Sequence, residues 1–180
     1  MTLTAILPSL RRSIPDPLDP DRWPELTLAT TTDVVVSGLP LLPLVELSGT
    51  PCSLGGCSVL PSRHGKLSQT HRTIVTVFCV ESVDAGGPDG PVIHLDGVND
   101  CATQVWSEAR LIGRASTAHA GAAIVVVGTG LRATGVTLPR DIHAGDLIAA
   151  PAQPVEAPSW SGSDDPAISP FIIQDVVLQE

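Results

Sequence analysis

Short apolar runs separated by turn residues fill the middle of the chain, from residue 71 to residue 151. The runs lie at residues 72–83, 92–95, 105–112, 122–127, 136–138 and 147–151. Most are rich in β-branched residues and are bounded by Gly, Pro, Asp or Asn, which is the pattern of successive short strands. Five or six strands at such intervals predict a barrel or a sandwich, so we expect a mainly β protein built around a compact β-barrel.

Proline dominates the N-terminal segment, which holds five Pro residues between positions 8 and 24. Prolines this frequent exclude a continuous helix or a central strand. Residues 1–25 are therefore predicted to form an extended arm, laid over the core or over a partner subunit, with Trp23 as its anchor. Residues 26–36 then alternate as a strand that adds to the barrel, and residues 39–47 predict a helix of about two turns.

The C-terminal part of the chain contains two segments of different composition. Residues 152–170 are rich in Pro, Ser and Asp and predict a loop. Residues 171–180 are predicted to form a terminal strand that is apolar enough to need a partner. Because 180 residues suit one domain with a sizeable core, we expect residues 1–180 to form a single β-barrel domain.

Composition and charge exclude several classes of partner. The net charge is −9, which excludes nucleic acid and anionic membranes because phosphate binding needs clustered Lys and Arg. No apolar run approaches the roughly 20 residues of a membrane span, and the N-terminus lacks the residue order of a secretion signal. We therefore expect a cytoplasmic protein. Its four cysteines do not make a disulfide framework in a chain of this length.

A short cluster of basic side chains lies within and directly after residues 52–70. Arg63, His64, Lys66 and His71 fall within nine residues, and Lys66 is the only lysine. The segment is short and rich in Gly, so we predict a loop rather than a domain. Two interpretations stay open for it. It is a polar surface loop, or it carries a binding site, since loops on a rigid β scaffold often do.

Two blocks of sequence resemble the diaminopimelate decarboxylases. The first block reads DPDRWP at residues 19–24, VSG at 36–38 and GTP at 49–51. The second reads VTVF at residues 75–78, DGVND at 96–100, LIGR at 111–114, STA at 116–118 and HAGDL at 143–147. The resemblance implies a compact β-barrel like the C-terminal domain of the fold-type III pyridoxal-phosphate decarboxylases. It also implies a homodimer, because those enzymes build their active sites across a dimer interface.

The departures from that family exclude a decarboxylase. The whole pyridoxal-phosphate barrel between the two blocks is missing, and residues 52–70 stand in its place. A pyridoxal enzyme needs a barrel lysine for its Schiff base, but the chain offers only Lys66, inside RHGK at residues 63–66. That segment looks like a rewritten form of the family's phosphate-binding turn, so new chemistry is expected there.

A decarboxylase relic without its barrel is similar to the piperazate synthases. That family is haem-dependent and closes N5-hydroxy-L-ornithine into L-piperazic acid by forming an N–N bond, in natural-product biosynthesis. The resemblance implies haem b as cofactor and N5-hydroxyornithine as substrate. The alternative is a non-catalytic decarboxylase-derived β-domain, a pseudoenzyme that acts as a protein-binding or regulatory subunit.

Haem usually takes an axial His, Cys thiolate or Tyr, and the chain has no Tyr. His64 is the first candidate for the iron ligand, because it lies next to Gly65 at the rewritten turn, and His71, directly after residues 52–70, is the second. Cys57, Cys79 and Cys101 are weaker candidates. We interpret His94 as either a hydrogen-bonded strand residue or a ligand, His119 as a solvated loop residue and His143 as a turn residue inherited from the decarboxylases.

Six charged residues complete the predicted site. Haem propionates or the substrate carboxylate would pair with basic side chains, for which the candidates are Arg63, Lys66 and Arg72. The α-ammonium group of the substrate would pair with acids, for which the candidates are Asp96, Asp100 and Glu108. For each acid, a solvated turn or surface position is the other interpretation.

Overall fold

The computed structural model describes residues 2–59, 67–86, 90–97, 104–128, 130–153 and 155–156. The protein is mainly β, as predicted. The N-terminal half holds α1 (Leu3–Ile6), η1 (Pro8–Arg12), β1 (Thr27–Ala29), β2 (Val34–Val36), β3 (Leu39–Pro40), α2 (Leu41–Ser48) and β4 (Cys52–Val59). The C-terminal half holds β5 (Leu67–Asp84), β6 (Val92–Leu95), η3 (Trp106–Glu108), β7 (Arg110–Ile112), β8 (Ala120–Val127), β9 (Leu131–Pro139), β10 (Leu147–Pro151) and β11 (Val155–Glu156).

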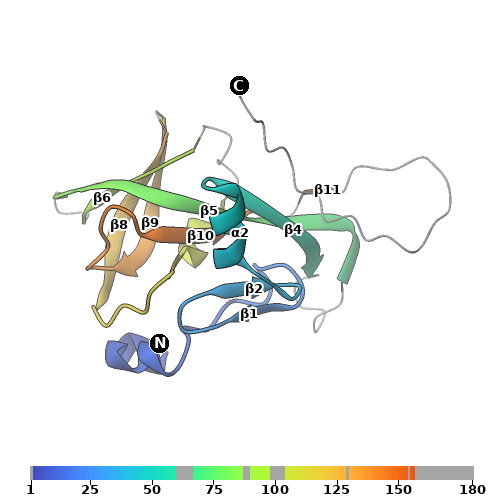
Figure 1. Cartoon of the computed structure of the whole chain (residues 1–180), viewed down its shortest axis with the longest axis horizontal. Coiled ribbons are helices and arrows are strands. Elements are labelled where there is room, and N and C mark those ends of the chain that lie inside the picture. Colours follow the sequence, from blue (N-terminus) through green and yellow to red (C-terminus); the bar gives the residue numbers. More distant parts are fainter. Residues whose placement is uncertain are drawn as a thin grey trace.

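Strand β5 organises the larger sheet. Its 18 residues run across the molecule (Figure 1), and the strands follow one another in the order β7-β10-β5-β6-β8-β9, with β4 and β11 also paired to β5. The neighbours are antiparallel except for β6 and β8, which are parallel. Figure 1 shows β8 and β9 upright on the side of the molecule away from β4.

The two faces of β5 bury two separate cores. Side chains alternate along a strand, so Val75 and Val77 point to one face and Phe78 and Val80 to the other. The first pair packs in a cluster with Trp23 and with residues of β2, α2 and β4. The second pair packs with residues of β6, β8, β9 and β10. Strand β5 therefore contributes to both cores. The N-terminal segment packs on one of its faces, and β6, β8 and β9 pack on the other.

Residues 26–36 do not form the single strand that their alternation predicts. They fold back at a turn in which the Thr30 Oγ1 accepts a hydrogen bond from the Asp33 N–H at 2.8 Å. The halves pair as β1 and β2, and β3 completes a small three-stranded sheet. The prediction that this segment adds to the larger sheet is therefore wrong. The helix predicted at residues 39–47 is confirmed as α2.

The N-terminal arm is partly helical, whereas an extended arm was predicted. Two short helical segments, α1 and η1, precede the Pro-rich stretch, and Pro8 begins η1, where its missing N–H costs nothing. Trp23 is buried, with 1% of its surface exposed, which confirms it as the anchor of the arm. Next to it, Pro24 lies so close to β4 that a Cβ on Gly56 would stand 2.7 Å from the Pro24 Cβ.

Residues 52–70 are predicted as a loop, but all of their described residues, 52–59 and 67–70, form strands. Strand β4 pairs with β5 from Cys52↔Val77 to Cys57↔Arg72, and the register shifts before Val59↔Leu67. The segment is thus a long hairpin that extends β5 beyond the core, and its residues 60–66 lie outside the described part. A second difference concerns the run at residues 105–112, which begins as η3 and becomes strand only at β7.

The remaining predictions have mixed outcomes. Strand β11 interrupts the loop predicted at residues 152–170, and the terminal strand predicted at residues 171–180 lies outside the described residues. The end strands β7 and β9 approach each other, but no ladder joins them within the described ranges. Closure of the sheet into a barrel therefore stays a prediction.

Candidate functional site

Two neighbouring spaces lie along the N-terminal arm. The arm groove has a volume of about 860 Å³ and lies between the arm, β1 and the end of β4. The seam cavity has a volume of about 280 Å³ and lies between β7 and the end of β9, under α1 and η1. Asp16 and Pro17 line both spaces, so a single stretch of the arm separates them.

The arm groove is mostly apolar. Its lining comprises Pro15, Asp16, Pro17, Leu18, Pro20, Asp21, Trp23, Pro24, Glu25, Leu26, Thr27, Leu28, Ala29 and Val59. Leu26 and Leu28 expose 69% and 66% of their surfaces. Leu26 also has a φ of +54°, a backbone conformation that costs a non-glycine residue free energy. Apolar lining and this volume are typical of cofactor and small-molecule sites.

The arm groove reaches the hairpin formed by β4 and β5. Val59, which lines the groove, is the last described residue before residues 60–66. The chain therefore continues from the edge of the groove directly into the segment that contains His64. The lining also holds three acids, Asp16, Asp21 and Glu25, and no His, Cys, Lys or Arg, so an axial ligand or a cation for a bound cofactor would come from residues beyond this lining.

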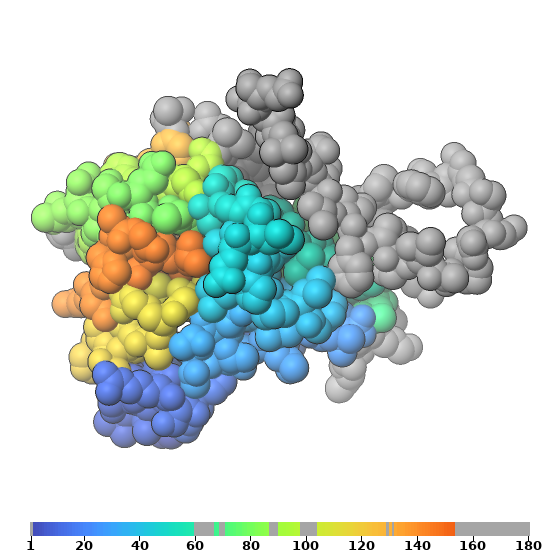
Figure 2. Space-filling model, viewed as in Figure 1, coloured from blue at the N-terminus to red at the C-terminus, as the bar shows by residue number. Residues whose placement is uncertain are grey.

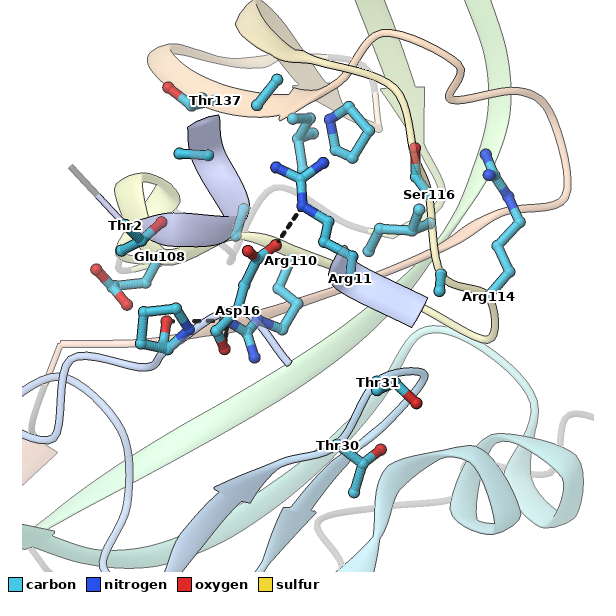
Figure 3. A pocket seen from close by; sticks show the side chains of 18 of the residues that line it. Thr2, Arg11, Asp16, Thr30, Thr31, Glu108, Arg110, Arg114, Ser116 and Thr137 are labelled. Carbon is cyan, nitrogen blue, oxygen red and sulfur yellow. Dashed lines mark hydrogen bonds and ion pairs between the residues drawn. The ribbon is translucent and has the colours of Figure 1, made fainter. Parts of the chain in front are cut away.

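The seam cavity is polar and is closed on one side by Arg11. Figure 3 shows Arg11 and Asp16 joined, with Arg110 beside them and Thr137 of β9 across the cavity. The Arg11 Nε lies 2.8 Å from an Asp16 carboxylate oxygen, and its Nη1 donates to the carbonyl oxygen of Ala118 at 2.8 Å. In Figure 2 the start of the arm, in dark blue, accordingly lies against the yellow segment that contains Ala118.

Arg114 lines the seam cavity but is bound to two aspartates outside it. Its Nε and Nη2 donate to the two carboxylate oxygens of Asp146, both at 2.7 Å, and its Nη1 lies 3.2 Å from Asp141. The hydrogen bonds to Asp146 raise the pKa of Arg114. Burial alone would raise the pKa of Asp146, but the bonds from Arg114 and the His143 N–H outweigh burial and lower it. Arg114 is therefore a structural cation.

Arg110 and Glu108 are held differently, by neutral groups. The Arg110 Nη2 donates to the carbonyl oxygens of Asp16 and Pro17. Burial lowers the pKa of Arg110, and the nearby Asp16 and Glu108 carboxylates oppose this. One Glu108 oxygen, Oε2, accepts from the Trp23 Nε1 at 3.2 Å and from the Asp19 N–H at 3.4 Å. Arg110 and Glu108 are the charged groups of the cavity that stay available to a ligand.

Of the predicted ammonium ligands, the structure places Glu108 in this cavity and Asp96 elsewhere. An Asp96 oxygen accepts from the Cys79 N–H at 2.6 Å, which fits the turn interpretation of this residue. Arg72 lies seven residues before Cys79 on β5, which is roughly 23 Å along a strand. Arg72 and Asp96 therefore do not meet. Arg63, His64, Lys66 and Asp100 lie outside the described residues.

His71 and Arg72 lie at the base of the hairpin, on opposite faces of β5. The His71 ring Nδ1 lies 3.3 Å from the Ser68 Oγ, and the Arg72 Nη1 lies 2.8 Å from the Cys57 sulfur. Alternation places His71 on the same face as Val75, which packs with Trp23 of the arm. Of the other histidines, His94 pairs with Asp84 at 3.0 Å, whereas His119 is exposed in a loop.

Arg11, Asp16 and Arg110 were not predicted from the sequence. Arg11 binds Ala118, and Arg110 binds Asp16 and Pro17, across 93 to 107 positions, which no local pattern predicts. Across the described ranges, no group of three or more His, Cys, Asp or Glu side chains is arranged to hold a metal ion. The described helices are all too short or too polar to cross a membrane. No family model and no curated protein matches this sequence.

Proposed function

We propose that the protein is a haem-dependent cyclase that closes N5-hydroxy-L-ornithine into L-piperazic acid. One observation carries the proposal: an apolar groove of about 860 Å³ adjoins the β4–β5 hairpin, which holds the segment that departs from the decarboxylases that the sequence resembles. A polar cavity with one free cation and one free anion shares a wall with that groove. We further propose that the larger sheet is a form of the decarboxylase β-barrel, with β7 and β9 at its seam.

The residues that would hold haem follow from the groove and from the hairpin sequence. Leu26, Leu28 and Val59 would contact the apolar ring. His64 would bind the iron, with His71 as second candidate, and Arg63, Lys66 or Arg72 would pair with the propionates. The chemistry that haem supplies when bound is activation of the substrate's N-hydroxyl group.

The protein's own contribution is positioning, exclusion of water and transfer of one proton. The N–N bond forms as the N–O bond breaks, and the hydroxyl group leaves as water. The α-ammonium group would lose two protons: the Glu108 carboxylate would accept one and relay it to the leaving hydroxyl group, and the other would go to solvent. Substrate and products have the same oxidation level overall, so no reductase is required. Holding the amine and the hydroxylated nitrogen in one cavity turns the ring closure into an oriented unimolecular step.

The haem ligand is tested by matched histidine variants. His64→Ala should lose the Soret band that the wild-type protein gains when haemin is added, and should lose ring closure with it. His143→Ala, which changes an exposed turn residue, should keep both. Absorption spectroscopy and product analysis by mass spectrometry check this. A normal Soret band in His64→Ala and its loss in His71→Ala would transfer the ligand role to His71; loss in neither would refute a ligand in this segment.

We propose that the protein is a homodimer. The arm exposes four large apolar side chains, which are Leu3, Ile6, Leu7 and Ile14. Apolar side chains concentrated on one segment mark a contact surface, and closed symmetric dimers are the commonest assembly of soluble chains. Sedimentation velocity should show a dimer at micromolar concentration, and Leu7→Asp should shift it toward monomer. A wild-type monomer at that concentration would contradict the proposal.

A further inference from the structure

The charges that line the seam cavity do not all cancel one another. Arg11 is paired with Asp16, and Arg114 with two aspartates beyond the cavity wall. That leaves Arg110 and Glu108, which take part in no ion pair in the part of the chain that the structure describes. The cavity therefore presents one cation and one anion, which is the complement of a zwitterion.

Arg110 is suited to a carboxylate. Its Nη2 is held in place by the carbonyl oxygens of Asp16 and Pro17, which fixes the plane of the guanidinium group. Its Nε and Nη1 have no hydrogen-bond partner among the described residues. A guanidinium group presents two parallel donors that match the two oxygens of a carboxylate. Burial limits the hydration of the Arg110 guanidinium group, so an anionic ligand would gain free energy by pairing with it.

Glu108 is suited to an ammonium group. Its Oε2 is occupied by the Trp23 Nε1 and the Asp19 N–H, whereas Oε1 accepts no bond from the described residues. The two existing bonds orient the carboxylate, and Oε1 stays available as an acceptor. Glu108 and Arg110 are two residues apart, at the junction of η3 and β7, and both line the cavity.

We propose that the seam cavity binds the zwitterionic head of an α-amino acid, with its carboxylate on Arg110 and its ammonium group on Glu108. This inference rests on the proposed function for the identity of the amino acid. Asp16 and Pro17 line both spaces, so the side chain of the ligand would point toward the stretch of the arm that borders the groove. The volume of about 280 Å³ accommodates such a small ligand.

Calorimetric titration of the full-length protein without haem tests this inference. L-Ornithine is the probe, because it keeps the carboxylate, the α-amine and the chain length but lacks the reactive N-hydroxyl group. Two relatives serve as matched controls: putrescine lacks the carboxylate, and 5-aminopentanoic acid lacks the α-amine. L-Ornithine should bind, and each control should bind at least tenfold more weakly. Equal binding of putrescine, or no binding of L-ornithine, would overturn the inference.

Variants locate the binding in the cavity. Arg110→Gln and Glu108→Gln should each weaken L-ornithine binding at least tenfold, whereas Arg132→Gln, an exposed residue of β9 that lines neither space, should not change it. Because Arg110 also holds the arm, Ala115→Leu gives an independent test: it fills the cavity and removes no hydrogen bond. Unchanged binding in Ala115→Leu, with thermal unfolding as in the wild type, would place the ligand elsewhere and refute the inference.

The two proposals fail in distinguishable ways. The Soret band of the haemin-treated protein reports on the arm groove and the hairpin, and L-ornithine titration reports on the seam cavity. A protein that binds haem but not L-ornithine would refute the cavity inference alone. A protein that binds L-ornithine in the cavity but never gains a Soret band would refute the haem proposal alone.

Discussion

Replacing Trp23 with Ala is expected to cost the fold about 3–5 kcal/mol, the usual cost of truncating a large buried aromatic side chain. Trp23 is 1% exposed and packs against Val75 and Val77 of β5. It is also the point where the Pro-rich arm meets the sheet. Most domains are stable by only about 5–15 kcal/mol, so the arm should detach or the domain should unfold well below the wild-type midpoint.

Two further variants separate the packing of Trp23 from its hydrogen bond. Trp23→Phe keeps most of the ring but loses the Nε1 bond to Glu108, for which we expect a cost of about 1–2 kcal/mol. Leu26→Ala, at a neighbouring exposed position, should stay within about 0.5 kcal/mol of the wild type. Urea unfolding measures all three. A cost below about 1 kcal/mol for Trp23→Ala would show that the arm is held in some other way.

Replacing Arg114 with Leu is expected to cost about 3 kcal/mol at neutral pH, because it leaves the buried Asp146 carboxylate without its cation. The Asp146 side chain is 4% exposed and accepts two bonds from Arg114. Arg132→Leu removes the same charge from an exposed position of β9 and should change the free energy of unfolding by no more than about 0.5 kcal/mol. Urea unfolding at neutral pH measures the difference.

The cost of Arg114→Leu should also depend on pH. In the wild-type fold the pKa of Asp146 is lower than its ordinary value, so the stability that it contributes is fully present above the unfolded value of about 3.9. That contribution is lost as the pH falls through the lower, folded pKa. In Arg114→Leu burial raises the pKa of Asp146, so the stability gap to the wild type should begin to narrow above about pH 4 and close as the pH falls through the lowered wild-type pKa. A gap that stays constant would contradict the assigned role of the Asp146 charge.

The strands of the core could be predicted because their cause is local. β-Branched runs bounded by turn residues became β5, β6, β8, β9 and β10. Strand β4 was missed because Gly55 and Gly56 disfavour a strand reading. The structure explains Gly56, which lets Pro24 approach to a distance that a Cβ would forbid. That reason lies in a contact between segments distant in the sequence, which no local pattern shows.

The residues of the candidate site likewise fall into two groups, those that the sequence could indicate and those that only the fold brings together. Glu108 was proposed from the sequence as a partner for the ammonium group of the substrate, and it lines the seam cavity. Asp96 was proposed for the same role, but its carboxylate instead accepts the Cys79 N–H of β5. Arg110 and Asp16 were missed because their significance arises only when the arm folds back over β7. Chain topology, rather than composition, brings the charges of the seam cavity together.

Conversion of N5-hydroxy-L-ornithine by the haemin-loaded protein tests the central claim most directly. Liquid chromatography coupled to mass spectrometry would follow the substrate and the product that has lost one water molecule, and comparison with authentic piperazic acid would establish the ring. We expect conversion that requires both protein and haem and that needs no added reductant. A haem-loaded protein that leaves the substrate unchanged would contradict the proposal and would favour a non-catalytic, protein-binding role.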